Sequence, residues 1–296
     1  MDTKYQQPLV VICGPTASGK TATALQLAHK YNGEIICADS RTVYKGMDIG
    51  TAKPSQEEQQ EVTHHLLDVV WPGDRFTAYD FQQLAFKAIE DIRSRNKLPI
   101  IVGGTGLYID SVIFNYQFPA QVPLKVRSRY EKMSIEELHK YCTKNNIKLP
   151  ENHKNKRYLI NSIVRKSNNN SDNNTIIDNI IIVGITTNKE ELKQRIMQRA
   201  EHMFDRGIVD EAKKLGKIYG WNNEAMTGNI YPLVKECIDG NLSYEKVIDK
   251  FTTLDWQLAR RQITWLKRNS HIQWMPRDLI FSYISSRLND QQARTN

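Results

Sequence analysis

The chain has 296 residues, of which 40% are hydrophobic and 25% charged, so its composition is that of an ordinary globular protein with one large domain or two modest ones. No apolar run approaches the roughly 20 residues needed to cross a bilayer, and the amino-terminal segment lacks the basic flank of a signal peptide, so we expect a cytoplasmic protein that does not enter a membrane. The formal charge of +8 allows a polyanionic partner, and four cysteines without a CxxC pair argue against a disulfide framework or a zinc site.

The first third of the chain alternates short apolar runs with helical patterns, as parallel α/β units do. The runs are bounded by turn residues, and Thr77 is placed to cap the longest helical pattern. These patterns predict strands at residues 9–13, 34–38 and 98–102, helices at 21–31 and 76–96, and a further helix after the GGTG turn at 103–106.

The middle of the chain has a different composition from about residue 115. Two prolines, Pro119 and Pro123, interrupt it, and basic residues follow before short helical patterns that run to Lys166. A polar low-complexity segment at 167–174 reads as a mobile loop. We therefore expect a helical insertion domain at residues 115–175.

The last part of the chain returns to the α/β pattern with a strand at 176–185, followed by a helix that Thr187 or Asn188 could cap. The last hundred residues read as helical and include the basic stretch LARRQITWLKRN. The fold class predicted is α/β: a parallel-sheet core at 1–114 and 176–296 with helices on both faces, interrupted by the smaller insertion.

A phosphate-binding loop is the strongest motif. Residues 14–21, GPTASGKT, fit GxxxxGK[ST] at every fixed position, after a predicted strand and at the start of a predicted helix. In such a loop, backbone N–H groups and the helix amino terminus face phosphate oxygens. The lysine adds a charge for the terminal phosphate, and the threonine hydroxyl can coordinate Mg²⁺. The predicted diphosphate-binding residues are Gly14, Pro15, Thr16, Ala17, Ser18, Gly19, Lys20 and Thr21, with Thr21 as the metal ligand.

An acidic residue follows the second predicted strand. Asp39 comes directly after EIICA, and if this strand neighbours the P-loop strand, the carboxylate lies at the edge where α/β sheets bind ligands. There it could bind a metal or act as a general base. From the pattern alone, a turn-capping role for the Asp-Ser pair is equally compatible.

Six segments in order resemble one family, the bacterial tRNA dimethylallyltransferases. After GPTASGKT come ADSRTVYKGMDIGTAKP, HHLLDVVWPGDRFTAYDF and IVGGTGLYI, and later RIMQRAEHMFDRGIVDEAKKL and LARRQITWLKR. The resemblance spans nearly the whole chain, and DIGTAKP and RQITW are far more specific than a P-loop. It implies an enzyme that uses dimethylallyl diphosphate to prenylate the exocyclic amine of adenosine 37, beside the anticodon of tRNAs reading codons that start with U.

The resemblance also implies roles for residues. Asp39 would be the general base, Thr105 would line the reaction channel, Lys20 would serve the diphosphate, and either Arg195 or Arg199 would contact that diphosphate. Mg²⁺ would be the cofactor, and we expect a monomer. By the same resemblance, contacts to tRNA come from Asp39, Ser40, Arg41, Thr42, Thr105, Arg127, Lys156, Arg157, a loop near 227–232, Arg260, Arg261, Gln262, Trp265, Lys267 and Arg268.

Three segments depart from the family pattern. Thr42 stands where the family usually has Gln, Ile230-Tyr231-Pro232 stands where it has GYK or GYR, and KRYLINSIVRK keeps only part of a basic pattern in a short insertion. All three fall on segments that the resemblance assigns to tRNA, while the P-loop and Asp39 are intact. A member with altered anticodon-loop contacts is therefore one hypothesis.

Other functions fit parts of the sequence. A P-loop kinase would need a strand ending in a Walker-B aspartate, and no such signal follows the first two units. An isopentenyltransferase acting on free adenine nucleotides would share the P-loop and the base without needing the basic carboxy-terminal helix. A non-catalytic RNA-binding protein would not need Lys20, Thr21 and Asp39 together.

Overall fold

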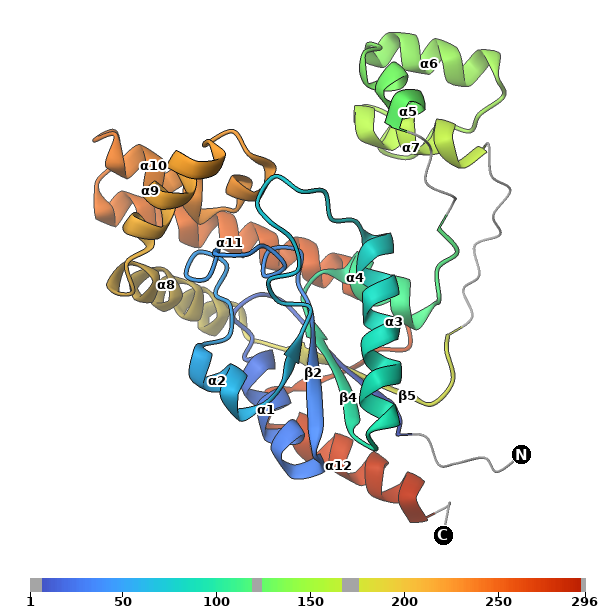
Figure 1. Cartoon of the computed structure of the whole chain (residues 1–296), viewed down its shortest axis with the longest axis vertical. Coiled ribbons are helices and arrows are strands. Elements are labelled where there is room, and N and C mark those ends of the chain that lie inside the picture. Colours follow the sequence, from blue (N-terminus) through green and yellow to red (C-terminus); the bar gives the residue numbers. More distant parts are fainter. Residues whose placement is uncertain (1–6, 119–123, 167–175, 294–296) are drawn as a thin grey trace. The chain divides into compact units, whose positions relative to one another are not determined.

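The computed structural model describes residues 7–118, 124–166 and 176–293. The chain divides into two compact units, one made of Met1–Ile113 with Ile177–Asn296 and the other of Phe114–Ile176 (Figure 1). These boundaries differ by one residue at each junction from those expected from the sequence. The polar segment at 167–174 and the two prolines at 119 and 123 lie outside the described residues.

The larger unit is built on a six-stranded sheet in which every pairing is parallel. The strand order is β3-β2-β4-β1-β5-β6. β1, β2 and β4 are buried along their whole length, as expected for parallel strands covered on both faces. The strands are β1 (Leu9–Cys13), β2 (Gly33–Ala38), β3 (His64–His65), β4 (Leu98–Gly103), β5 (Ile180–Thr186) and β6 (Gln273–Pro276).

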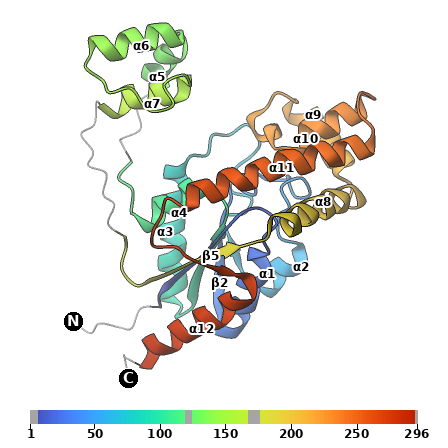
Figure 2. The same cartoon turned by 180° about the vertical axis from the view of Figure 1, so that it is seen from behind.

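Helices cover both faces of this sheet, so the predicted fold class is confirmed. α1 and α12 pack together on one face, and α3 packs with α4 on the other (Figures 1 and 2). The helices between residues 189 and 266 form a second apolar cluster, whereas the helix at 56–61 has no buried residue. The helices are α1 (Lys20–Tyr31), α2 (Gln56–Glu61), α3 (Ala78–Ser94), α4 (Gly106–Ile113), α8 (Lys189–Asp205), α9 (Ile208–Tyr219), the 3₁₀ helix η1 (Glu224–Thr227), α10 (Ile230–Ile238), α11 (Tyr244–Leu266) and α12 (Arg277–Ala293).

Capping residues near the helix ends determine where several helices begin or end. Thr77 caps α3 in a reciprocal pair with Asp80, because the Thr77 hydroxyl accepts from the Asp80 N–H while the Asp80 carboxylate accepts from the Thr77 N–H. Asn188, rather than Thr187, caps α8 by accepting from the N–H groups of Glu190 and Glu191. α1 ends at Asn32, whose positive φ of 48° stops the helix.

The placement of Asp39 was argued on the condition that β2 neighbours the P-loop strand, and this condition is not met, because β4 lies between β1 and β2. β4 pairs with β2 over its full length and with β1 from Ile100 to Gly103. Gly103, its last residue, allows a very close approach at this edge, since a Cβ atom there would lie 2.0 Å from the carbonyl oxygen of Ala38. The loops that follow β1, β2 and β4 therefore still meet at one edge of the sheet.

Three further expectations from the sequence need correction. β5 begins at Ile180 rather than at 176, because Asn179 takes a left-handed φ of 54°, which interrupts the extended backbone just before the strand. The carboxy-terminal hundred residues include the strand β6 between two helices. The segment 227–232, expected as a loop, contains the end of η1 and the start of α10.

The smaller unit contains three helices, α5 (Leu124–Glu131), α6 (Ile135–Lys144) and α7 (Lys156–Lys166). Its apolar core lies between α6 and α7 and consists of Leu138, Cys142, Leu159, Ile160 and Ile163. The guanidinium group of Arg127 donates to Asn161 at 3.2 Å, which ties α5 to α7. Among the described helices of both units, none combines the length and the apolar character that a membrane crossing requires.

Candidate functional site

The P-loop joins β1 to α1 and is held in a compact turn by its own polar groups. The Ser18 hydroxyl donates to the carbonyl of Pro15 at 2.8 Å, and the ammonium group of Lys20 donates to the same carbonyl at 2.5 Å. Gly19 at the α1 cap has a left-handed φ of 87°, a conformation that glycine adopts without strain. Two hydrogen bonds to one carbonyl and a glycine with positive φ therefore fix the turn.

Lys20 has an unusual electrostatic environment. Burial is the main effect and lowers the pKa of its ammonium group to about 8; Arg199 acts in the same direction, while the nearby carboxylate of Asp39 opposes it. The charged form of such a lysine is stabilised strongly when a phosphate binds beside it, because the anion replaces the compensation that water gives to an exposed ammonium group. The site is therefore suited to an anionic ligand.

Asp39 follows β2 and is fixed by a turn. Its Oδ1 atom accepts from the N–H of Arg41 at 2.7 Å, and the N–H of Ser40 donates to the hydroxyl of Thr105 at 3.1 Å. The N–H of Thr105 in turn donates to the carbonyl of Ala38 at 3.2 Å. The turns after β2 and β4 therefore support each other, and this pairing positions Asp39 although β2 and β1 are not neighbours.

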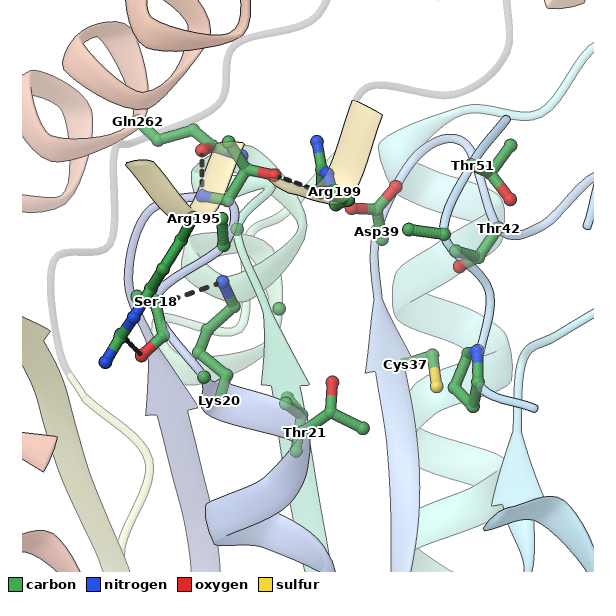
Figure 3. Close-up of a pocket in the computed structure, with 18 of the residues that line it drawn as sticks. Ser18, Lys20, Thr21, Cys37, Asp39, Thr42, Thr51, Arg195, Arg199 and Gln262 are labelled. Atoms are coloured by element: carbon green, nitrogen blue, oxygen red, sulfur yellow. Dashed lines mark hydrogen bonds between the residues drawn. The ribbon is translucent and has the colours of Figure 1, made fainter. Parts of the chain in front are cut away.

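Two cavities meet at these turns. The larger, of about 490 Å³, is lined by residues 16–21 of the P-loop, by Asp39 and by Arg195 and Arg199. The smaller, of about 240 Å³, is lined by Ser40, Arg41, Thr105 and Arg261 among others. Figure 3 shows Lys20 and Asp39 on opposite sides of the larger one. The residues that line both cavities are Thr16, Asp39, Thr51, Arg199 and Gln262.

Both candidate arginines of α8 reach the P-loop (Figure 3). Arg195 donates to the carbonyl of Ser18 at 3.5 Å and pairs with Glu191. Arg199 donates to the hydroxyl of Thr16 at 2.7 Å and pairs with the buried carboxylate of Asp255 on α11. Both line the larger cavity, and Arg199 also lines the smaller one, so Arg199 lies where the two cavities meet.

The residues of α11 that were assigned to tRNA divide into two groups. Gln262 and Trp265 turn inward: the N–H of Thr16 donates to Gln262 Oε1 at 2.8 Å, and Trp265 Nε1 donates to Asp110 at 2.6 Å. Trp265 also packs on Gly106, where a Cβ atom would lie 2.1 Å from its ring. The exposed members are Arg260, Arg261, Lys267 and Arg268, and Arg261 also lines the smaller cavity.

The other residues assigned to tRNA lie in varied surroundings. Arg41 donates to the carbonyl of Glu224 and the hydroxyl of Thr227, while Thr42 is buried at the wall of the larger cavity. In the smaller unit, Arg127 pairs with Glu131 within α5, and Lys156 and Arg157 begin α7, with Arg157 exposed.

Sequence reasoning missed the support of the loop DIGTAKP. The carboxylate of Glu211 on α9 accepts hydrogen bonds of 2.8–2.9 Å from the N–H groups of Asp48, Ile49 and Gly50. The hydroxyl of Tyr231 donates to the same carboxylate at 2.8 Å. Three consecutive N–H groups without a strand partner require an acceptor, but the sequence does not reveal which distant carboxylate supplies it.

Comparisons with known proteins agree with this architecture. Residues 42–269 match the sequence profile of the family described as IPP transferase. The chain is 35% identical to a tRNA dimethylallyltransferase of Staphylococcus epidermidis over 91% of this chain and 87% of that protein, and 36% identical to one of Staphylococcus aureus over 91% and 93%.

Solved structures have the same fold as this chain. The full-length tRNA isopentenylpyrophosphate transferase of Bacillus halodurans superposes with a TM-score of 0.74 at 31% identity, covering 98% of this chain and 99% of that one. A eukaryotic dimethylallyltransferase superposes with a TM-score of 0.78, covering 92% of this chain and 74% of that one; at 24% identity it supports the fold alone. The matched segment includes Asp39's supporting turn at Thr105, the arginines of α8 and the basic end of α11. This chain belongs to the IPP transferase family.

Proposed function

We propose that this protein transfers a dimethylallyl group from dimethylallyl diphosphate to N6 of adenosine 37 in tRNAs reading codons that start with U. The products are N6-dimethylallyladenosine and diphosphate. The names of the relatives, which are tRNA dimethylallyltransferases, support the tRNA acceptor and the prenyl donor. The position in the tRNA and the codon class follow from the motif resemblance and are part of the proposal.

The observation that carries the proposal is the meeting of the two cavities at Asp39. The larger cavity brings the P-loop and two arginines together, which suits the diphosphate of the donor. The smaller one is lined by the Asp39–Arg41 turn and by Arg261, which suits a base extruded from RNA. Asp39 lines both, so a donor and an acceptor in the two cavities would each face its carboxylate.

The proposed step is a displacement at C1 of the allyl group. The C1–O bond to the diphosphate breaks, a bond from N6 to C1 forms, and the proton lost from N6 passes to the carboxylate of Asp39. Lys20, the P-loop N–H groups and the arginines stabilise the negative charge that grows on the departing diphosphate. The hydroxyl of Thr105 holds the turn that aims Asp39.

Mg²⁺ fits the residues at the P-loop. The hydroxyl of Thr21 lines the larger cavity and is a hard oxygen donor of the kind that Mg²⁺ prefers. The described residues contain no cluster of three or more His, Cys, Asp or Glu side chains that could hold a metal alone. We therefore assign Mg²⁺ to Thr21 and the donor's phosphate oxygens, where the ion would neutralise charge on the leaving diphosphate.

For the tRNA, we assign the anticodon stem-loop to the basic residues named above. Arg260, Arg261, Lys267 and Arg268 form an exposed positive strip at the end of α11 that can neutralise phosphates. Gln262 and Trp265 support this strip from inside by binding the P-loop and α4. Arg127, Lys156 and Arg157 of the smaller unit are assigned to the same partner, and the protein is proposed to act as a monomer.

The test is to incubate the protein with Mg²⁺, dimethylallyl diphosphate and an unmodified tRNA carrying A36-A37-A38, and to look for prenylated adenosine by mass spectrometry. We expect product at A37, lost with Asp39→Ala and absent when AMP replaces tRNA. Product on AMP but not on tRNA would move the enzyme to the class that acts on free nucleotides. No product on either acceptor would refute the proposal, and ATP-dependent phosphate transfer would then be tested.

A further inference from the structure

The first residue of α12 packs directly on the P-loop. A Cβ atom built on Gly19 would lie 2.7 Å from Nη1 and 2.8 Å from Cδ of Arg277. Such distances are far below van der Waals contact, so the Arg277 side chain lies directly against the backbone of Gly19 and would have to shift if a Cβ atom stood there. Residues 19 and 277 are far apart in the sequence, and Arg277 lies beyond the segment that matches the family profile.

The sheet topology explains why Arg277 reaches this place. β6 runs parallel to β5, and β5 runs parallel to β1, so all three strands end at the same edge of the sheet. The P-loop follows β1 at that edge, and Arg277 follows β6 directly. α12 then runs beside α1, as Figure 2 shows, which keeps its first turn next to the start of α1.

The charge of Arg277 is available for a ligand. Arg195 is paired with Glu191, and Arg199 with Asp255, so part of the charge of each is already compensated. Arg277 is exposed, and in the described part of the chain no carboxylate forms an ion pair with it. Of the three arginines in contact with the P-loop, it is the one that a phosphate group would neutralise without competition.

We propose that Arg277 is a further diphosphate-binding residue, whose guanidinium group binds oxygens of the donor's diphosphate from the Gly19 side of the P-loop. Its planar fork of N–H donors matches two phosphate oxygens at once. The guanidinium group lies against the backbone of Gly19, beside the P-loop residues that would hold the diphosphate. The role rests on the proposed function, in which the P-loop holds an allylic diphosphate.

The test measures binding of inorganic pyrophosphate with Mg²⁺ by calorimetry on the full chain. Arg277→Met keeps an unbranched side chain over Gly19 without the charge, and Arg277→Lys keeps the charge without the fork. Arg287, on the same α12 and packed on the ring of Tyr283, gives the matched control Arg287→Met. We expect about a tenfold or greater loss of affinity for Arg277→Met, a smaller loss for Arg277→Lys and no change for Arg287→Met.

Pyrophosphate affinity in Arg277→Met equal to that of the unaltered protein would overturn the proposal. A thermal melt without ligand separates binding from folding, because a binding role predicts the same Tm for Arg277→Met and the unaltered protein. The result is also independent of the acceptor. If the unaltered protein binds pyrophosphate through Arg277 but does not prenylate tRNA, the proposed function fails while this site stands.

Discussion

The backbone N–H of Ser40 donates a hydrogen bond to the hydroxyl of Thr105 at 3.1 Å. This bond joins the turn after β2 to the turn after β4, and the Thr105 N–H strengthens the junction by donating to the carbonyl of Ala38. Asp39 lies between the two bonded residues of its own turn, Ala38 and Ser40. Its carboxylate is therefore positioned by Thr105 without a bond to the threonine itself.

Replacing Thr105 with valine tests this positioning. Valine has the same shape but cannot accept from Ser40, so we expect kcat for tRNA prenylation to fall by about tenfold, the value of one lost hydrogen bond. Thr105→Ser keeps the hydroxyl and should retain most of the activity. Affinity for pyrophosphate should be equal in both variants, because Thr105 lies outside the P-loop; a kcat for Thr105→Val equal to that of Thr105→Ser would contradict the assignment.

Asp255 should contribute more to stability than any surface carboxylate. It is buried, pairs with Arg199 and accepts from Asn229 at 2.7 Å. Asp255→Ala would leave Arg199 without its partner in a site where the Arg199 Nε is already buried and unbonded, and we expect a loss of about 3 kcal/mol in the free energy of unfolding.

The matched control for that loss is the exposed pair of Lys235 and Asp239, one turn apart on the surface. Asp239→Ala should cost less than about 0.5 kcal/mol, because solvent screens such pairs. Urea unfolding of the two variants gives both values. Equal costs would mean that Asp255 does not hold Arg199.

The affinity for diphosphate should fall as the pH rises through about 8. Burial holds the pKa of Lys20 near 8 in the free protein, so its ammonium group loses its proton above that pH, and the neutral amine attracts phosphate weakly. Pyrophosphate binding measured from about pH 7 to about pH 9 should therefore weaken steadily. Lys20→Arg stays charged throughout and should flatten the profile; the same slope in both proteins would assign the titration to another group.

Local patterns predicted the elements of the fold and the P-loop because their signals lie within a few residues. The capping pair of Thr77 and Asp80 and the glycines of GPTASGKT are of this kind. The order of strands is different, since the pairing of β4 with β1 and β2 depends on how whole segments pack. β6 was not predicted, because its four residues, Gln273–Pro276, are too few to show a strand pattern.

The candidate site shows the same division. The P-loop could be read directly from the sequence and Asp39 only as one of two alternatives. The groups that hold them come from distant helices: Gln262 binds the P-loop, and Glu211 binds the DIGTAKP loop. Some glycines mark positions where a large side chain packs on the backbone: Gly106 accommodates Trp265, and Gly50 accommodates Tyr231. The sequence does not reveal which large residue packs on each glycine.

Asp110 should make the fold less stable as the pH rises. Burial is the main cause that raises the pKa of this carboxyl group to about 6, while Trp265, which donates to it, acts in the opposite direction. The folded protein thus holds the proton more tightly than the unfolded chain, in which this carboxyl has its ordinary pKa of 3.8. This contribution to stability is complete below the unfolded pKa and is lost as the pH rises through about 6.

Asp110→Asn removes the titration and keeps an oxygen that accepts from Trp265 Nε1. We therefore expect the variant to be more stable than the unaltered protein at about pH 7.5, by up to roughly 2 kcal/mol, with the difference shrinking towards about pH 4. Thermal melts across this range measure the effect. Trp265→Phe, which removes the donor that favours the charged carboxylate, should steepen the pH dependence instead. A constant difference between Asp110→Asn and the unaltered protein at every pH would show that the charge of Asp110 is already compensated in the fold.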